Sequence, residues 1–330
     1  MIDLVIIGAG PIGLEAAIRA KRAGLSYKVL EKGCIVNAIA HYPTYMGFFT
    51  SSERLEIGGH PLVTATDKPT RKEALDYYRK VVQNEGLNVE QYTEVVGLSP
   101  RTAGFDITTC RREGRATIRA RKVVIATGYF DNPKLLGVPG EELANVSHYY
   151  TEAHPYFDRN VTLIGAGSSA ADAALDLFRA GAKVTIVHRG EDFRHSLKYW
   201  IRPNLENRIA EGAITAHFRT EVREITETAV IAVKEGRELR IPSDQTFALT
   251  GYFASPKLLE MAGVQVDRDT LAAELNEDFE SNVPGLYVIG SAGFGLRTSD
   301  VFIENGLVHT ARAMKDIIGK LERQAVAELG

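Results

Sequence analysis

The strongest constraint on this chain is a pattern that occurs twice: an apolar strand, a glycine-rich turn and a helix. In the first copy, the apolar residues 2–7 run into Gly8-Ala9-Gly10-Pro11-Ile12-Gly13, and a helix over 14–23 is ended by Gly24. A second strand over 27–31 ends in an acid, Glu31. In such a unit the first glycine makes the tight turn, the second admits a pyrophosphate and the third lets helix and strand pack closely. The pattern predicts a dinucleotide-binding unit.

The chemistry of this first unit indicates which nucleotide it takes. Free N–H groups and the helix dipole favour a pyrophosphate at the start of the helix. The Glu31 carboxylate can accept hydrogen bonds from a ribose diol, which selects an unphosphorylated ribose. The first site therefore predicts FAD, with contacts from Gly8, Gly10, Pro11, Gly13 and Glu31.

The second copy differs where the ribose would be read. A strand over 160–164 precedes Gly165-Ala166-Gly167-Ser168-Ser169-Ala170, a helix to 180 and a strand over 183–187. That strand ends in His188-Arg189 with no acid, and Arg194 follows five residues later. A 2′-phosphate is attracted by arginine and repelled by a carboxylate, so this site predicts NADPH. The alternative is that both arginines are solvated surface charges.

The remaining segments predict an α/β fold of two Rossmann-like, three-layer domains. Apolar strands are expected near 123–128 and 285–290, a β-meander between 90 and 121, and antiparallel strands over 220–240. We expect a discontinuous FAD-binding domain, 1–130 and 248–330, with an NADPH-binding domain, 131–247, inserted into it. A final helix is predicted over about 301–321, with Asp300 as its N-cap.

Composition narrows the class of function. The net charge of −3 and the absence of long Lys/Arg runs argue against nucleic-acid or anionic-membrane partners. No segment reaches the roughly 18 apolar residues of a membrane helix, and the start lacks the basic head of a signal peptide. Cys34 and Cys110 provide neither a disulfide framework nor a metal-ligand spacing, so we expect no metal and a cytoplasmic location.

Longer segments carry a specific resemblance. The chain is similar to thioredoxin-reductase-like flavoproteins and, within them, to the bacillithiol-disulfide reductase family. The segments that carry the resemblance are Glu31-Lys32-Gly33 with Val36-Asn37, Tyr42-Pro43-Thr44, residues 48–52 and 55–58, residues 147–156, Lys198-Tyr199-Trp200, and Phe302-Ile303-Glu304-Asn305-Gly306. The resemblance implies an NADPH- and FAD-dependent reductase of bacillithiol disulfide that forms a homodimer or higher homo-oligomer.

The resemblance and the glycine patterns together place further cofactor contacts. For FAD these are Lys32, Asn37, Thr127, Gly128, Gly290 and Glu304. For NADPH they are Gly165, Gly167, Ser168, Ser169, His188, Arg189 and Arg194.

The chain departs from its relatives at the positions of redox cysteines. Thioredoxin reductases carry Cys-x-x-Cys before the second glycine turn, where this chain has Tyr149-Tyr150-Thr151-Glu152. The bacillithiol-disulfide reductase family usually has a cysteine before the last glycine of the first turn, and that position is Ile12. Ser291 also stands where many relatives have an aspartate for the flavin ribityl chain. A dithiol relay is therefore excluded, and a thiol mechanism cannot be carried over through Ile12.

Four residues are candidates, three for the chemistry and one for substrate binding. Cys34 would need a thiolate near the flavin, and the alternative is a buried structural cysteine. His148 or Tyr149 would line a pocket and supply a proton to a leaving thiolate, and the alternative is aromatic packing between domains. Lys198 would reach an anionic substrate, or be solvated like most lysines.

Several functions remain open at this point. The acceptor is a small-molecule disulfide or another electron acceptor. A ferredoxin- or flavodoxin-NADP reductase has the same layout and also lacks Cys-x-x-Cys. A flavin monooxygenase also pairs two Rossmann motifs, and a non-catalytic redox sensor would use the cofactors only for binding.

Overall fold

The chain divides into two compact units. The structure, a computed structural model, describes residues 1–194, 197 and 199–329. Unit 1 comprises Met1–Ala40, Met46–Asn132 and Tyr252–Gly330, and unit 2 comprises His41–Tyr45 and Pro133–Gly251. Each unit is described by itself below.

The elements of unit 1 are β1 (Ile2–Ile7), α1 (Pro11–Arg22), β2 (Tyr27–Leu30), α2 (Asn37–Ala40), η1 (Ser52–Leu55), α3 (Arg71–Glu85), β3 (Val89–Glu90), β4 (Glu94–Arg101), β5 (Gly104–Arg111), β6 (Gly114–Ile125), α6 (Lys257–Met261), β15 (Leu286–Val288), η3 (Gly290–Gly293) and α7 (Ile303–Leu329). Those of unit 2 are β7 (Val146–Ser147), η2 (His154–Tyr156), β8 (Asn160–Ile164), α4 (Ser168–Arg179), β9 (Lys183–Val187), α5 (Arg202–Ala210), β10 (Ile214–His217), β11 (Thr220–Ile225), β12 (Ala229–Lys234), β13 (Arg237–Pro242) and β14 (Gln245–Ala248).

Unit 1 is built on a mixed sheet with β1 inside it. The strand order is β3-β2-β1-β6-β5-β4, and β15 pairs with β6. β1 pairs in parallel with β2 and β6, and its residues Leu4, Val5 and Ile6 are fully buried. A strand buried on both faces reads as a continuous apolar run, which is why the period of two is absent here. The predicted α/β class is confirmed.

The strand β6 changes partners along its length. Its first half pairs antiparallel with β5, and from Ala120 onward it pairs in parallel with β1 and then with β15. The predicted meander is present as β4, β5 and β6. Its last strand, however, is continuous with the apolar strand that was expected near 123–128. The meander is thus part of the same sheet rather than a separate layer.

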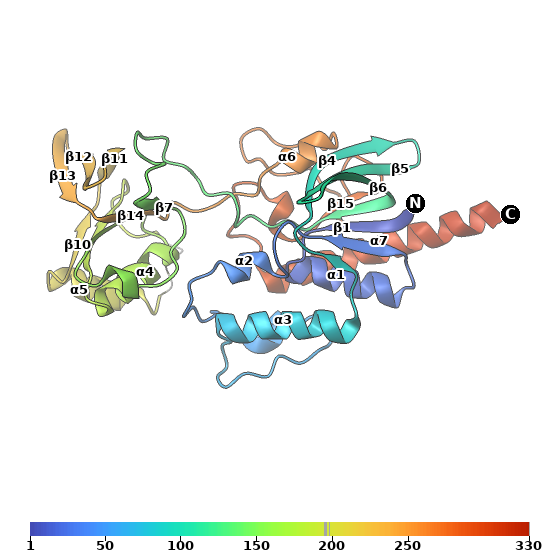
Figure 1. Cartoon of the computed structure of the whole chain (residues 1–330), viewed down its shortest axis with the longest axis horizontal. Helices are drawn as coiled ribbons and strands as arrows, with labels where there is room; N and C mark the ends of the chain where they lie inside the picture. Colours follow the sequence, from blue (N-terminus) through green and yellow to red (C-terminus); the bar gives the residue numbers. More distant parts are fainter. Residues whose placement is uncertain (195–196, 198, 330) are drawn as a thin grey trace. The chain divides into compact units, whose positions relative to one another are not determined.

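The helices of unit 1 have clear local causes. Thr70 and Glu73 form a reciprocal capping box at the start of α3, and Gly86 ends that helix in a left-handed conformation. α1 and α7 pack side by side beneath β1 and β15 in Figure 1. The prediction of a helix over about 301–321 was wrong at both ends, because α7 begins at Ile303 and ends at Leu329. The Asn305 side chain, not that of Asp300, fixes its entry: Oδ1 accepts the Phe302 N–H at 2.7 Å and Nδ2 donates to the Asp300 carbonyl at 2.8 Å.

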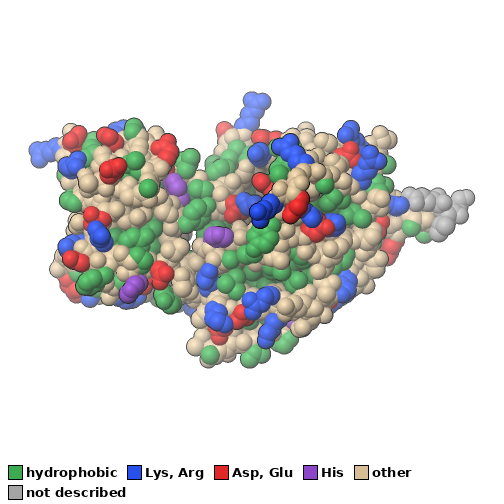
Figure 2. All heavy atoms as spheres, in the orientation of Figure 1, with side chains coloured by type: hydrophobic (Ala, Val, Ile, Leu, Met, Phe, Trp, Pro, Cys, Tyr) green, Lys and Arg blue, Asp and Glu red, His purple; other side chains and the backbone are tan. Residues whose placement is uncertain are grey.

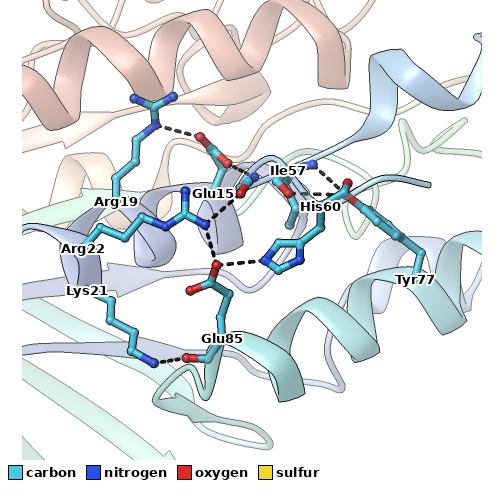
Figure 3. Close-up of polar contacts among 9 residues, drawn as sticks. Glu15, Arg19, Lys21, Arg22, Ile57, His60, Tyr77 and Glu85 are labelled. Atoms are coloured by element: carbon cyan, nitrogen blue, oxygen red, sulfur yellow. Dashed lines mark hydrogen bonds and ion pairs between the residues drawn. The ribbon is translucent and has the colours of Figure 1, made fainter.

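A polar cluster fixes the segment that follows η1 to α1 and α3 (Figure 3). The buried Glu15 carboxylate accepts the Gly58 N–H at 2.7 Å, and Arg22 donates to the Gly58 carbonyl at 2.8 Å. Glu85, near the end of α3, pairs with Arg22 at 2.5 Å and with His60 at 2.8 Å. The cluster therefore holds a loop without regular structure against two helices.

Unit 2 repeats the parallel arrangement on a smaller scale. Its sheet has the order β10-β9-β8-β14-β7 and is parallel throughout. The antiparallel strands β11, β12 and β13 form a second sheet, as predicted for 220–240. The buried side chains of Val161, Leu163 and Ile186 pack with those of α4 on one face, and Ile164 and Val187 pack with the second sheet on the other.

The surface has a mixed charge. Acidic and basic side chains are interspersed over the face drawn in Figure 2. Among the described residues, no helix combines the length and apolar composition that crossing a bilayer requires. The same described residues contain no group of three or more His, Cys, Asp or Glu side chains placed to hold a metal ion.

Candidate functional site

The glycines of the first turn, between β1 and α1, are needed for two different reasons. A Cβ on Gly8 would lie 2.5 Å from the Ala126 carbonyl oxygen, and one on Gly13 would lie 2.0 Å from the Gly8 carbonyl oxygen. Both glycines are therefore required by the chain's own packing. A Cβ on Gly10 would meet nothing within 4 Å, although Gly10 caps α1 without any side-chain hydrogen bond. The open space at a bare helix start fits the pyrophosphate of a dinucleotide.

Glu31 directly follows β2, and its side chain contacts the first glycine turn. Its Oε2 accepts the Ala9 N–H and its Oε1 accepts the Gly33 N–H, each at 2.8 Å. The side chain is buried, and burial raises the pKa of its carboxyl group. Two backbone donors hold the carboxylate in place, and each oxygen keeps a lone pair that could accept from a ribose hydroxyl. The neighbouring Lys32 forms an ion pair with Asp131 at 3.0 Å.

Three of the other predicted FAD residues lie on loops and helix starts of unit 1. Asn37 opens α2, and its Oδ1 lies 3.6 Å from the Cys34 Sγ. Thr127 is exposed just after β6. Glu304 lies in the first turn of α7 and accepts a hydrogen bond from the Thr50 hydroxyl.

The start of α1 meets two glycine positions that are distant in sequence. Gly290 has a φ of +65°, and a Cβ there would lie 3.4 Å from Ile12. A Cβ on Gly306, in α7, would lie 2.8 Å from the Ile12 Cδ1. Gly128, also left-handed with a φ of +69°, lies close enough to η3 that its Cβ would be 3.9 Å from the Ser291 Oγ. The structure thus brings Gly128, Gly290 and Gly306 together around the first glycine turn, and Ile12 fills the space between η3 and α7.

His309 is a residue of this region that the sequence did not indicate. Its ring stacks between Phe279 and Phe294, with centroid separations of 4.0 and 5.7 Å. Among the described residues, its buried Nδ1 has no hydrogen-bond partner. Burial lowers the pKa of His309, with a smaller contribution from Arg312, while the Gly290 carbonyl acts in the opposite direction. A neutral imidazole therefore lies beside η3, and only the fold brings these segments together.

The second glycine turn, between β8 and α4, resembles the first at its first two glycines, whereas Ala170 stands at the place of the third. Gly165 has a φ of +129°, and a Cβ there would lie 2.4 Å from the Leu249 carbonyl oxygen. Gly167 caps α4 without a side-chain hydrogen bond, and Ser168 and Ser169 are the first residues of the helix. The Cδ of Arg194 would lie 3.9 Å from a Cβ on Gly167. The N-terminus of α4 therefore also has an uncapped end, with space at Gly167 that a larger residue's side chain would occupy.

The cations predicted to read the ribose lie beyond the end of β9. Arg189 and Arg194 are exposed, and the Arg194 N–H donates to the Ala166 carbonyl at 3.1 Å. Burial lowers the pKa of His188, and the charges of Arg194 and Arg189 lower it further. The positive charges of both arginines therefore act on His188 beside the glycine turn.

Comparison with known proteins agrees with this geometry. The family model described as pyridine nucleotide-disulphide oxidoreductase matches residues 5–290. The chain belongs to this family. It is therefore an oxidoreductase that depends on FAD and NAD(P)H, which confirms the expected flavin and nicotinamide cofactors at that level.

Individual proteins of known name are similar to this chain over most of its length. Bacilliredoxin reductase Bdr of Bacillus subtilis is 41% identical over 315 residues, 95% of this chain and 96% of the relative. The solved structure of bacillithiol disulfide reductase Bdr from Bacillus cereus has a TM-score of 0.94 at 41% identity, covering 97% of this chain and 99% of that one. A ferredoxin–NADP reductase of Lactococcus lactis is 27% identical over 303 residues, 88% of this chain and 86% of the relative. The resemblance inferred from the sequence is thus confirmed.

Cys34 is the candidate thiol nearest the first turn. Burial raises the pKa of the Cys34 thiol, and the charge of Glu31 raises it further. Its Sγ lies 3.6 Å from the Asn37 Oδ1. The surroundings therefore favour the neutral thiol, whereas a redox-active cysteine needs the thiolate. Cys110 lies on β5, and both cysteines are free.

The two other candidates lie in unit 2. The His148 Nδ1 lies 3.3 Å from the Ala248 carbonyl oxygen, and its Nε2 lies 3.5 Å from the Glu141 carboxylate. The Tyr149 N–H donates to the Ser147 hydroxyl at 3.1 Å. These contacts of His148 and Tyr149 are made within unit 2. Their roles in catalysis stay predictions.

The segment that replaces Cys-x-x-Cys is partly a core element. The Tyr150 ring is buried and contacts Phe247 edge-on at 5.4 Å, and its hydroxyl donates to Asp176 of α4 at 2.5 Å. Tyr156 also contacts Phe247 at 5.4 Å. These tyrosines therefore pack within unit 2. Lys198, the predicted contact for an anionic substrate, lies outside the described residues.

Proposed function

We propose that this protein is an NADPH-preferring, FAD-containing reductase of a low-molecular-weight disulfide, namely bacillithiol disulfide. The observation that carries the proposal is the likeness over nearly the entire chain to proteins named bacilliredoxin reductase and bacillithiol disulfide reductase. The overall reaction is balanced: NADPH, a proton and one disulfide give NADP⁺ and two thiols. Bound FAD would supply the two-electron redox centre between the nucleotide and the disulfide.

The two units divide the binding work in this proposal. Residues 1–130 and 248–330 form the FAD-binding domain, in which the open space at Gly10 and the fixed carboxylate of Glu31 hold the pyrophosphate and the ribose. Residues 131–247 form the NADPH-binding domain, in which Arg189 and Arg194 bind the 2′-phosphate. We also propose that the enzyme is a cytoplasmic homodimer or higher homo-oligomer, which sedimentation velocity would test.

The cysteine content shapes the proposal. Ile12 fills the position of the usual family cysteine, and the pKa of the Cys34 thiol is raised by burial. Neither position offers a ready thiolate. We therefore infer that the substrate disulfide is reduced without a covalent intermediate on an enzyme cysteine.

A second candidate function follows from the same observation. Ferredoxin–NADP reductases do not need an enzyme thiol, and one such protein is 27% identical over 88% of this chain. The acceptor would then be a small electron-transfer protein, and no disulfide would be reduced.

The two candidates are separated by following NADPH consumption by the purified holoenzyme. The acceptors are bacillithiol disulfide, glutathione disulfide, ferredoxin and oxygen alone. We expect bacillithiol disulfide to give the highest kcat/KM, with two thiols released for each NADPH. Efficient reduction of ferredoxin without thiol release would refute the proposal in favour of the second candidate.

A further inference from the structure

Lys134 is held at the end of β14 in unit 2. Its backbone N–H donates to the Gly251 carbonyl at 2.9 Å, and its carbonyl accepts from the Thr250 hydroxyl at 2.5 Å. Both partners follow β14 directly. The backbone of Lys134 therefore has a fixed place relative to the parallel sheet.

That place is beside the second glycine turn. The turn follows β8, which lies between β9 and β14 in the sheet. Gly165 approaches the end of β14 so closely that a Cβ would lie 2.4 Å from the Leu249 carbonyl oxygen. Arg189 and Arg194 follow β9 instead. Lys134 and the two arginines thus approach the turn from opposite sides of β8.

The charges converge although they come from opposite sides. The aliphatic part of Arg194 lies over Gly167, with its Cδ 3.9 Å from the position of a Cβ there. Burial lowers the pKa of Lys134, and the positive charge of Arg194 lowers it further. Two cations close enough to disfavour each other, beside the positive end of the α4 dipole, are stabilised when an anion lies among them.

Resting on the proposed function, we propose that Lys134 binds the pyrophosphate of the nicotinamide nucleotide. In a dinucleotide-binding unit the adenosine ribose is read at the end of the second strand, which here is β9. The pyrophosphate lies at the helix start between the strands. Lys134 therefore contacts the part that NADPH and NADH share, whereas Arg189 and Arg194 contact the 2′-phosphate that only NADPH carries.

The test compares Lys134→Ala and Lys134→Arg in the holoenzyme. Lys183→Ala is the matched control, because Lys183 begins β9 and pairs with Asp158 at 2.8 Å. The measurements are kcat/KM for NADPH and for NADH with ferricyanide as acceptor, and calorimetric binding of NADP⁺ and of adenosine 2′-monophosphate. For Lys134→Ala we expect both kcat/KM values to fall at least tenfold by the same factor. NADP⁺ binding should weaken equally, and adenosine 2′-monophosphate binding should not change.

Lys134→Arg should recover most of the loss, because it keeps the positive charge, and Lys183→Ala should match the wild type. A fall for NADPH alone, with weaker adenosine 2′-monophosphate binding, would place Lys134 at the 2′-phosphate and overturn the assignment. Unchanged constants for every ligand would overturn it too. Ferricyanide reduction and NADP⁺ binding do not involve the natural acceptor. A failure to reduce bacillithiol disulfide is therefore distinguishable from a failure of this inference.

Discussion

Alanine substitutions at Gly10, which precedes α1, and at Gly13, which lies within α1, should have different effects. At Gly13 the new Cβ would lie 2.0 Å from the Gly8 carbonyl oxygen, a backbone atom that cannot rotate away. At Gly10 the backbone has a φ of −71° and a ψ of 173°, which alanine adopts readily, and the new Cβ meets no protein atom within 4 Å. Gly13→Ala should therefore damage the fold, and Gly10→Ala should damage only the ligand site.

The magnitudes follow from these contacts. Overpacking a core costs about 1–3 kcal/mol and more where the backbone is struck, while alanine regains about 1 kcal/mol of helix propensity. We expect Gly13→Ala to lower the free energy of unfolding by about 2 kcal/mol, the upper end of that cost less the regained propensity. Gly10→Ala should lower it by only about 0.5 kcal/mol, because alanine is a slightly poorer N-cap than glycine. Losing one charge-assisted hydrogen bond of about 1.5–3 kcal/mol to the pyrophosphate should raise the FAD Kd about 10- to 100-fold.

Two assays separate the effects. Urea unfolding of the apoproteins, followed by circular dichroism, measures the free energy of unfolding. Titration with FAD, followed by flavin fluorescence, measures the Kd. If Gly10→Ala binds FAD as tightly as the wild type, the open space at this position is not a pyrophosphate site. If the Gly13→Ala apoprotein is as stable as the wild type, the packing argument is wrong.

Three further predictions concern nucleotide choice, thiols and pH. Arg189→Ala combined with Arg194→Ala should reduce the ratio of kcat/KM for NADPH over NADH at least tenfold. The reason is that each contact to the 2′-phosphate contributes about 1.5–3 kcal/mol. Equal use of both nucleotides by the wild type would contradict this. Cys34→Ser combined with Cys110→Ser should leave NADPH-dependent turnover nearly intact, and lost activity at unchanged FAD content would make a thiol essential. The lowered pKa of His309 means that protonation opposes folding, so stability should fall as the pH drops through the unfolded-state value of about 6.5. His309→Phe keeps the ring stack and removes the titrating group, so it should abolish most of that pH dependence, as thermal unfolding between pH 5 and 8 would show.

The sequence alone determined the α/β class and the positions of both glycine turns. Gly8, Gly13 and Gly165 belong to a pattern that spans only a few residues and is recognisable without the fold, although Gly8 and Gly165 pack against the distant Ala126 and Leu249. The residue types just after the second strand of each copy, Glu31 in one and Arg189 in the other, can likewise be read from a short stretch of sequence. The assignment of each turn to FAD or NADPH stays a prediction that the experiments above address.

Only the tertiary structure decided which distant residues meet at these turns. Ile12 lies between Gly290 and Gly306, and Lys134 comes within range of Arg194, although nothing in their local sequence marks these pairs. The start of α7 was misplaced for the same reason, because its entry depends on the side chain of Asn305 inside the helix. Local patterns report the conformation of a short segment. Contacts across the sheet depend on strand order and register, which the whole chain sets when it buries its apolar faces.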